Sequence, residues 1–236
     1  MKNFFNSTFF ISICHPFNPQ KRKEIRNKIR ENKKILESKR FLHYAPEALK
    51  VLSKAISEYK KPIKIWLEFG TLLGYYRENN ILKNDTDIDF GIEENNSIEE
   101  FIQYLEKREF KLLRKFIINS NISYLNNFTA EYTIQYKDSV SIDFFIFKSI
   151  QNKKICYCFD EKNNNSYNVS YIEYDNFELE KTIFLNQEFY RPNNIQKHLS
   201  SYYGDDFMIP KSYSYEDRPK DREIPLDQNT VGIKVS

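Results

Sequence analysis

Two aspartates, Asp87 and Asp89, stand one residue apart in the segment DTDIDFGI. In a strand, residues i and i+2 project from the same face, so the two carboxylates would lie side by side while Ile88 and Phe90 face a core. Two like charges this close are unfavourable unless a cation lies between them. Hard oxygen ligands suit Mg²⁺, with Mn²⁺ as an alternative. The pair therefore predicts a divalent metal site at a strand end.

A third carboxylate, Asp143, is the one acid in the apolar segment VSIDFFIF. A buried carboxylate without a partner is costly, so Asp143 has either a basic or hydrogen-bonding partner or a place in the metal site. Because the upstream pair already indicates a metal, we favour the metal site. Asp87, Asp89 and Asp143 are thus the predicted metal ligands and catalytic residues.

The turn before the Asp87–Asp89 strand has features that suit a phosphate. The chain has five glycines, and three of them, Gly70, Gly74 and Gly91, fall within residues 66–92. Gly70 and Thr71 follow the expected strand IKIWLEF and open the expected helix GTLLGYYRE. Glycine lets a ligand approach the backbone closely, and the N–H groups of a helix N-terminus attract anions. The turn at Gly70 and Thr71 is therefore a candidate phosphate site, and the alternative is an ordinary strand–turn–helix connection, which is common.

Further elements must position these groups. The pattern predicts a basic helix over residues 19–41 and a second helix, EALKVLSKAISEYK, that begins at Pro46. Ser97 and Glu100 have the spacing of a capping box for the helix SIEEFIQYLEKR. A last helix, IQKHLSSYYG, should end at Gly204. The predicted strands after the acidic pair are FKLLRKFII, AEYTIQYK, VSIDFFIF, ICYCFD and YNVSYIEY. This order predicts an α+β domain with a mostly antiparallel or mixed sheet.

The composition narrows the class of protein. A chain of 236 residues with 40% hydrophobic residues suits one large domain, or one domain with an appended arm, and excludes disorder throughout. Three cysteines without a framework argue against a disulfide scaffold, and three isolated histidines give no support to a histidine-rich metal site. No apolar run approaches the ~20 residues of a membrane helix. We therefore expect a cytoplasmic protein.

The charge is distributed unevenly. Residues 21–40, which begin with Lys21 and end with Arg40, hold ten Lys or Arg and three Glu, a net charge of +7. Since the whole chain carries +3, the other residues sum to −4. This basic arm could attract an anionic membrane surface or an acidic polymer. The alternative is an ordinary solvated helix whose apolar stripe, Ile25, Ile29 and Leu36, packs on the domain.

Together the motifs resemble the LicD/fukutin branch of the nucleotidyltransferase superfamily. The branch has an apolar strand with one Asp, here SIDFFIF, and a late acidic segment, here YYGDDFMIP. The usual Pro-Trp before the acidic run is replaced by Lys83-Asn84, and the usual Ala-Val before Arg77 by Tyr75-Tyr76. The resemblance covers residues 46–213. Its first two motifs match at Leu67, Glu68, Gly70, Thr71, Leu72, Leu73, Gly74, Arg77, Asp85, Asp87, Ile88 and Asp89.

This resemblance implies a nucleotidyltransferase-like mixed β-sheet core flanked by helices, with an N-terminal helical arm. It divides the chain into an N-terminal extension at 1–41, a catalytic domain at 42–213 and a C-terminal tail at 214–236. It implies a transferase that moves a phospho-alcohol group, of phosphocholine or alditol phosphate type, from a CDP-linked donor to a hydroxyl of a surface glycan, with release of CMP. Gly70, Thr71 and Gly74 would then contact the phosphates of the nucleotide, and Asp143 would also help to deprotonate the acceptor.

Four other residues are candidates for substrate binding. Arg77 ends the short helix and could clamp a phosphate, or it is an ordinary surface arginine. Arg191, in FYRPNN, precedes the last helix and could meet the substrate. Asp205 and Asp206 follow that helix and either position the acceptor or form a turn after Gly204.

Two rival functions differ in class. The first is a nucleotidyltransferase that adds NMP to a small molecule or protein, with the same carboxylates but release of pyrophosphate. The second is a non-catalytic module whose basic arm docks on membrane or nucleic acid. The three aspartates argue against the second, and no nucleic acid partner is expected.

Overall fold

The structure is a computed structural model that describes residues 18–163, 165–211, 218 and 220–236. The first 17 residues of the predicted N-terminal extension lie outside this part of the chain. Helices and a large sheet are both present, which confirms the expected α+β class. None of the helices in the described ranges is long and apolar enough to cross a membrane.

In the part of the chain that the structure describes, the sheet has eleven strands in the order β10-β7-β11-β3-β4-β5-β2-β1-β9-β8, with β6 paired to β5 and β7. Most pairs are antiparallel, but β2 runs parallel to β5 and β1 runs parallel to β9. The sheet is therefore mixed, as the segments predicted. The bounds are β1 Ile65–Leu67, β2 Asp87–Glu93, β3 Phe110–Asn119, β4 Phe128–Tyr136, β5 Val140–Ile150, β6 Lys153–Asn163, β7 Ser166–Asp175, β8 Leu179–Phe184, β9 Gln187–Pro192, β10 Ile224–Pro225 and β11 Val231–Val235.

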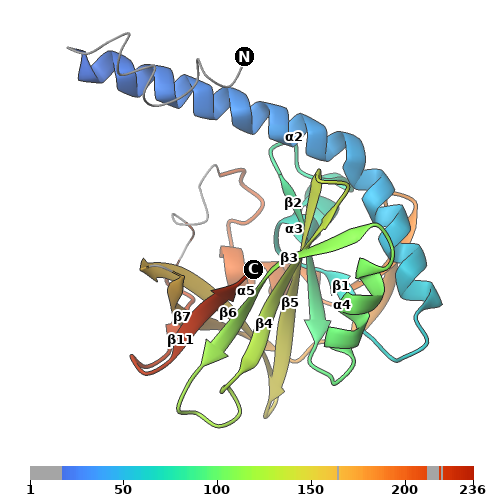
Figure 1. Ribbon diagram of the computed structural model, residues 1–236. Coiled ribbons are helices and arrows are strands. Elements are labelled where there is room, and N and C mark those ends of the chain that lie inside the picture. The colour runs from blue at the N-terminus through green and yellow to red at the C-terminus, as the bar shows by residue number, and fades with distance from the viewer. Residues whose placement is uncertain (1–17, 164, 212–217, 219) are drawn as a thin grey trace.

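Part of the sheet closes on itself. Because β6 pairs with both β5 and β7, a ring of strands runs β7–β11–β3–β4–β5–β6 and back to β7 (Figure 1). The first half of β5 pairs with β2, and only its end, from Lys148 to Ile150, pairs with β6. β2 therefore branches away from the ring at β5 and leads to β1 and the helices.

Within the described residues, four helices accompany the sheet: α2 Pro19–Glu58, α3 Phe69–Glu78, α4 Ile98–Glu106 and α5 Ile195–Tyr203. α5 ends at Gly204, which has a positive φ, as predicted. Ser97 does stand at the start of α4, but its side chain makes no capping hydrogen bond, so the predicted capping box is wrong. The Ser97 N–H instead donates to the side chain of Asn95, which turns the chain before the helix.

The two predicted N-terminal helices form one 40-residue helix, α2, with Pro46 inside it. Proline in a helix interior removes one hydrogen bond. Here Ala45, Ala48 and Leu49 are fully buried against the domain, and this packing holds the helix together across the proline. The prediction that Pro46 begins a separate helix is therefore wrong.

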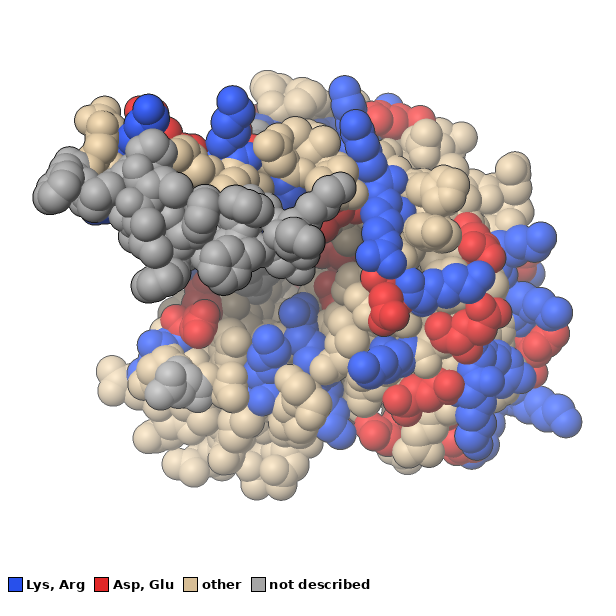
Figure 2. All heavy atoms as spheres, turned by 45° about the horizontal axis from the view of Figure 1, so that its top comes forward, with Lys and Arg blue, Asp and Glu red and all other residues tan. Residues whose placement is uncertain are grey.

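The first half of α2 projects away from the domain (Figure 1). Its first buried residues are Ser38 and Phe41, whereas Leu36 is 67% exposed. The predicted docking of the stripe through Leu36 is therefore not seen, because the helix reaches the domain only after that residue. Except for Arg22 and Arg26, which are half-buried, the Lys and Arg residues of 21–40 are exposed; basic side chains of this helix are visible at the upper left of Figure 2.

The C-terminal residues are part of the sheet, not a surface tail. β11 lies between β3 and β7 and pairs with both, and β10 pairs with β7. The prediction of a tail over 214–236 is therefore corrected for residues 224–225 and 231–235. The prolines and charges that suggested a tail lie mainly before β11.

Gly91 explains why a glycine stands in the middle of β2. A Cβ there would lie 2.2 Å from the indole of Trp66, which is fully buried on the neighbouring strand β1. Only glycine lets the tryptophan pack across β2 at this point. The close packing of Trp66 on Gly91 fixes β1, and with it the start of α3, beside the acidic strand.

Candidate active site

The strand register assembles the acidic residues into one row across the sheet. Asp89 on β2 lies opposite Asp143 on β5, and Asp143 lies opposite Thr133 on β4. Thr133 in turn lies opposite Arg114 on β3. Residues opposite each other in adjacent strands share a face, so this row brings carboxylates, a hydroxyl and a guanidinium together.

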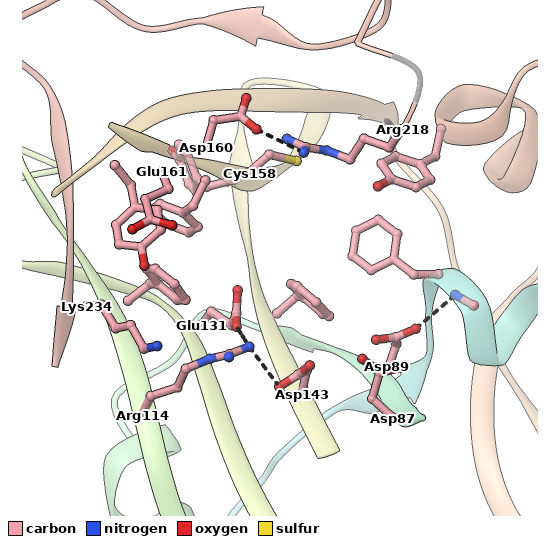
Figure 3. Close-up of a pocket in the computed structure, with 18 of the residues that line it drawn as sticks. Asp87, Asp89, Arg114, Glu131, Asp143, Cys158, Asp160, Glu161, Arg218 and Lys234 are labelled. Atoms are coloured by element: carbon pink, nitrogen blue, oxygen red, sulfur yellow. Dashed lines mark hydrogen bonds and ion pairs between the residues drawn. The ribbon is translucent and has the colours of Figure 1, made fainter. Parts of the chain in front are cut away.

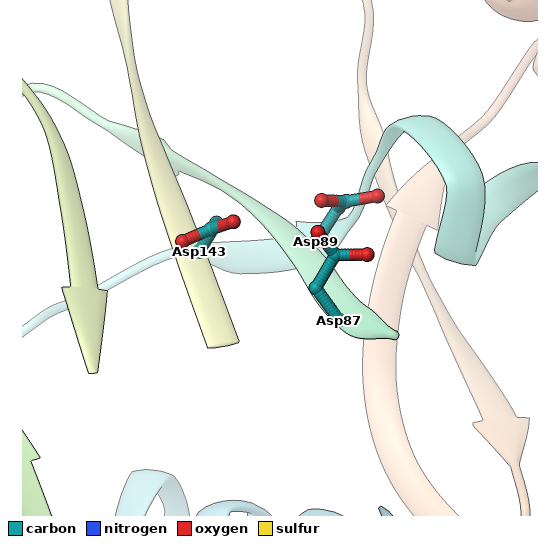
Figure 4. A group of neighbouring side chains, drawn as sticks. All are labelled: Asp87, Asp89 and Asp143. Carbon is teal, nitrogen blue, oxygen red and sulfur yellow. The ribbon is translucent and has the colours of Figure 1, made fainter. Parts of the chain in front are cut away.

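The three predicted metal ligands do meet. Asp87, Asp89 and Asp143 each offer a carboxylate oxygen, and these oxygens lie within 4.8 Å of one another (Figure 4). Asp143 is buried, with 6% exposure, and the other two are half-buried. Three carboxylates at this spacing form a hard-oxygen set, which is the chemistry that Mg²⁺ or Mn²⁺ prefers. The residues present therefore fit a divalent cation.

The turn before α3 holds Asp89 at three points. The N–H of Glu68 donates to the Asp89 carbonyl at 3.1 Å, and the N–H of Asp89 donates to Thr71 Oγ1 at 2.8 Å. The N–H of Gly70 donates to Asp89 Oδ2 at 2.9 Å. A Cβ on Gly70 would lie 3.1 Å from the same oxygen. Gly70 and Thr71 thus fix the position of Asp89 and of its carboxylate.

Glu68 anchors this turn from behind. Its carboxylate accepts a hydrogen bond from Trp66 Nε1 at 2.6 Å and lies 2.7 Å from Nε2 of His198 on α5. All three residues are buried. Glu68 therefore faces structural partners and not the acidic cluster, because its buried carboxylate is satisfied here by two ring nitrogens.

Sequence reasoning missed Arg114 and Glu131. Arg114 Nη2 lies 3.3 Å from Glu131 Oε1 and 3.8 Å from Asp143 Oδ1. Thr133 also donates to Asp143. Asp143 therefore has both of the roles between which the sequence left a choice: it has hydrogen-bonding and basic partners, and it joins the acidic cluster. The sequence signal that could have identified them is one Arg in the predicted strand FKLLRKFII and one Glu in the predicted strand AEYTIQY.

Burial raises the pKa of every carboxyl in the cluster. Desolvation is the main cause for all three aspartates, and neighbouring carboxylates raise the pKa further for Asp89 and Asp143. The pKa of Asp143 rises to about 8, that of Asp89 rises well above its ordinary value, and that of Asp87 also rises. The pKa of Asp85, which lies nearby, rises to about 7. Carboxyls held in this state need a cation to be fully ionised at neutral pH.

The metal-free protein should therefore lose stability as pH rises. A carboxyl with a raised pKa binds more protons in the folded than in the unfolded state between about pH 4 and about pH 8, so the free energy of unfolding falls across that interval. Urea unfolding in EDTA at about pH 5 and about pH 8.5 measures this slope. Asp143→Asn should flatten it. An equal slope in the wild type and the variant would contradict the assignment.

A cavity of about 570 Å³ opens beside the cluster. It lies inside the ring of strands, since Phe116, Glu131, Asp143, Phe159 and Tyr167 come from five different strands of that ring. Figure 3 shows Asp87, Asp89 and Asp143 along one side of this cavity, across from Asp160 and Glu161. β-Barrel mouths commonly hold ligands, so the acidic cluster has a substrate-sized space next to it.

Other predicted residues lie outside this cavity. Gly74 packs on the loop after α3, where a Cβ would lie 2.5 Å from the carbonyl oxygen of Asn80. Arg77 donates to the carbonyl of Ile209, and Asp206 pairs with Lys211; both line a separate small hollow. Gly74, Arg77 and Asp206 are thus not brought to the acidic cluster.

Arg191 and Asp205 are also away from the cluster. Arg191 pairs with Glu180 at 2.9 Å and donates to the carbonyl of Pro192, both on the β8–β9 hairpin. Asp205 is exposed after α5. For Arg191 and Asp205, as for Arg77 and Asp206, substrate binding stays a prediction.

Comparison with known proteins agrees with the motifs. A family model described as LicD/FKTN/FKRP, nucleotidyltransferase domain, matches residues 62–194. No curated protein sequence matches the chain. Among solved structures, the lincomycin-bound crystal structure of the lincosamide antibiotic adenylyltransferase LnuA is similar with a TM-score of 0.34 and 11% identity, over 56% of this chain and 70% of that chain. The family match spans more than half of the chain and includes all three clustered aspartates, so this protein belongs to the LicD/FKTN/FKRP family.

Proposed function

We propose that this protein is a metal-dependent transferase that moves a phospho-alcohol group from a CDP-linked donor to a glycan hydroxyl and releases CMP. The observation that carries the proposal is the cluster of Asp87, Asp89 and Asp143 beside a cavity, in a chain of the LicD/FKTN/FKRP family. Family membership supports a transferase of phosphoryl-type groups. The CDP donor and the glycan acceptor follow from the resemblance stated above.

The residues have distinct tasks in this proposal. Asp87, Asp89 and Asp143 would hold Mg²⁺, which when bound neutralises charge on the transferred and leaving oxygens. The turn at Gly70 and Thr71 orients Asp89, and the donor phosphates would lie beside this turn. Asp143 would receive the proton of the acceptor hydroxyl as the new oxygen–phosphorus bond forms and the bond to CMP breaks.

In an alternative reaction, the same three carboxylates would hold the metal, but the acceptor would attack the phosphorus of the nucleoside monophosphate. The chain would then be a nucleotidyltransferase that adds NMP to an acceptor and releases pyrophosphate. The description of the matching family model, which names a nucleotidyltransferase domain, favours keeping this alternative.

A thermal-shift panel of nucleotides with and without Mg²⁺ tests the class. We expect CDP and CMP to raise the melting temperature only when Mg²⁺ is present, because the phosphates and the carboxylates repel without it. Cytidine should give little shift, and AMP and GMP less than CMP. Equal shifts for all nucleotides without metal would contradict the proposal.

We also propose that the basic arm, residues 21–40, brings the enzyme to an anionic membrane surface at the cytoplasmic face. The arm carries +7 and projects from the domain before Ser38. Each basic residue near an anionic surface contributes about 1 kcal/mol, and this attraction falls as salt screens it.

Neutralising Lys23, Lys28, Lys33 and Lys34 with Gln should raise the KM for a lipid-linked acceptor several-fold at low salt. These lysines are exposed and none of them lines the cavity, so kcat on a short soluble acceptor should not change. The measurement is steady-state kinetics with both acceptors at two salt concentrations. Identical KM values for the variant and the wild type on the lipid-linked acceptor would leave the arm as an ordinary solvated helix.

A further inference from the structure

The C-terminal strand β11 completes the wall of the barrel cavity. It lies outside the family-matched residues 62–194 and fills the place between β3 and β7. A Cβ on Gly232 would lie 2.5 Å from the ring of Phe159, a cavity residue, so this face of β11 points inward. Lys234, two residues later, shares that face and lines the cavity.

The register places Lys234 next to the acidic row. Lys234 lies opposite Phe116 on β3, and Phe116 lies opposite Glu131 on β4. Arg114 is two residues before Phe116 on the same strand and lines the same cavity. Figure 3 shows Lys234 and Arg114 projecting into the same side of the cavity from neighbouring strands.

The two cations differ in their partners. Arg114 is 3.3 Å from Glu131 and 3.8 Å from Asp143. Lys234 is half-buried, yet within the part of the chain that the structure describes its ammonium group has no ion pair and no side-chain hydrogen bond. An ammonium that is partly desolvated beside a guanidinium is unfavourable unless an anion lies between or in front of them. Among the described residues, the Lys234 ammonium group is therefore a positive charge in the cavity that no side chain pairs with.

We propose that Lys234 and Arg114 form a subsite for a phosphate group of the substrate. This rests on the proposed transfer reaction, in which the reacting phosphate lies at the aspartates. The subsite is on the β3–β11 side of Asp143, opposite the Gly70 side, so it would hold a phosphate other than the one the aspartates hold. That group is either the second phosphate of the nucleotide donor or a phosphate on the acceptor. Arginine binds phosphate oxygens in a fork and lysine binds them as a point charge.

The test compares Lys234→Gln and Lys234→Arg with the wild type. Calorimetry in Mg²⁺ measures binding of pyrophosphate, CDP and cytidine, and steady-state kinetics measures KM for the donor and for acceptors with and without a phosphate. Lys162→Gln is the matched control, because Lys162 is an exposed lysine of the same barrel that does not line the cavity.

We expect Lys234→Gln to weaken binding of pyrophosphate or CDP about tenfold, equivalent to ~1.4 kcal/mol, and to leave cytidine binding unchanged. Lys234→Arg should restore most of the loss. A rise in donor KM assigns the phosphate to the donor. A rise in KM confined to a phosphate-bearing acceptor assigns it to the acceptor; either result supports the subsite.

Pyrophosphate and CDP binding within about twofold of the wild type, together with unchanged KM values, would overturn the subsite. Failure of the proposed function looks different. In that case the wild type itself would not bind cytidine nucleotides and would not transfer a phospho-alcohol group. The pyrophosphate comparison would still decide the subsite, since it needs neither a donor nor an acceptor.

Discussion

Replacing Asp89 with Asn should lower the transfer rate at least about 100-fold, because removal of one charge-stabilising group from such a site costs about 3 kcal/mol or more. Asp87→Asn should behave alike. The melting temperature of the metal-free variants should be equal to or higher than that of the wild type. The reason is that the Asp87, Asp89 and Asp143 carboxylates lie within 4.8 Å of one another and repel when ionised.

Asp138→Asn is a matched control, since Asp138 lies in the turn before β5 and outside the cavity. It should keep full activity. The measurement is initial rate with saturating donor, together with thermal melting in EDTA. An Asp87 or Asp89 variant that keeps more than about a tenth of the wild-type rate would exclude that residue as a primary ligand.

Gly70→Val should abolish both nucleotide binding and turnover without unfolding the protein. A Cβ on Gly70 already lies 3.1 Å from Asp89 Oδ2, and the branches of valine would displace that carboxylate and cover the backbone N–H that donates to it. We expect turnover to fall at least about 100-fold. Calorimetry with CDP and Mg²⁺ measures nucleotide binding, initial rates measure turnover, and far-UV circular dichroism shows whether the variant is folded.

Gly70→Ala gives a graded control. Its single methyl group requires Asp89 to move by only a few tenths of an ångström, so binding should weaken less than with valine. Normal CDP binding by the valine variant would show that the turn does not face the donor. A structure with bound nucleotide whose phosphates lie far from Gly70 would also show that the turn does not face the donor.

The sequence predicted the local part of the site well. The alternation of Asp87 and Asp89 with Ile88 and Phe90 depends on strand geometry alone, and the structure has the two apolar residues buried and the two acids on the cavity side. The strand–turn–helix at Gly70 is equally local. Both could be predicted because each depends on residues close together in the chain.

The cross-strand part of the site could not be predicted from local patterns. Arg114 meets Asp143 only because β3, β4 and β5 pair in one register, and a shift by one residue would turn each side chain to the opposite face. The place of β11 between β3 and β7 depends on pairing between segments more than fifty residues apart. The charged, proline-containing segment before β11 led to the prediction of a tail, although β11 is a strand that completes the barrel.

Pro46 shows the same limit for helices. Local rules favour a helix start at proline, but the buried Ala45, Ala48 and Leu49 stabilise a continuous helix across it. The predicted roles of Gly74 and Arg77 also came from position in the chain, whereas the contacts of Gly74 with Asn80 and of Arg77 with Ile209 depend on the tertiary fold.

The most direct test of the proposed chemistry is the identity of the leaving group. The purified protein is incubated with Mg²⁺, a panel of CDP-linked alcohols and a glycan acceptor, and the products are separated by ion-exchange chromatography and assigned by mass spectrometry. The proposal predicts CMP in a one-to-one ratio with an acceptor that has gained a phospho-alcohol group, and neither product with Asp89→Asn. Release of pyrophosphate from CTP, with an acceptor that has gained CMP, would contradict it and establish a nucleotidyltransferase instead.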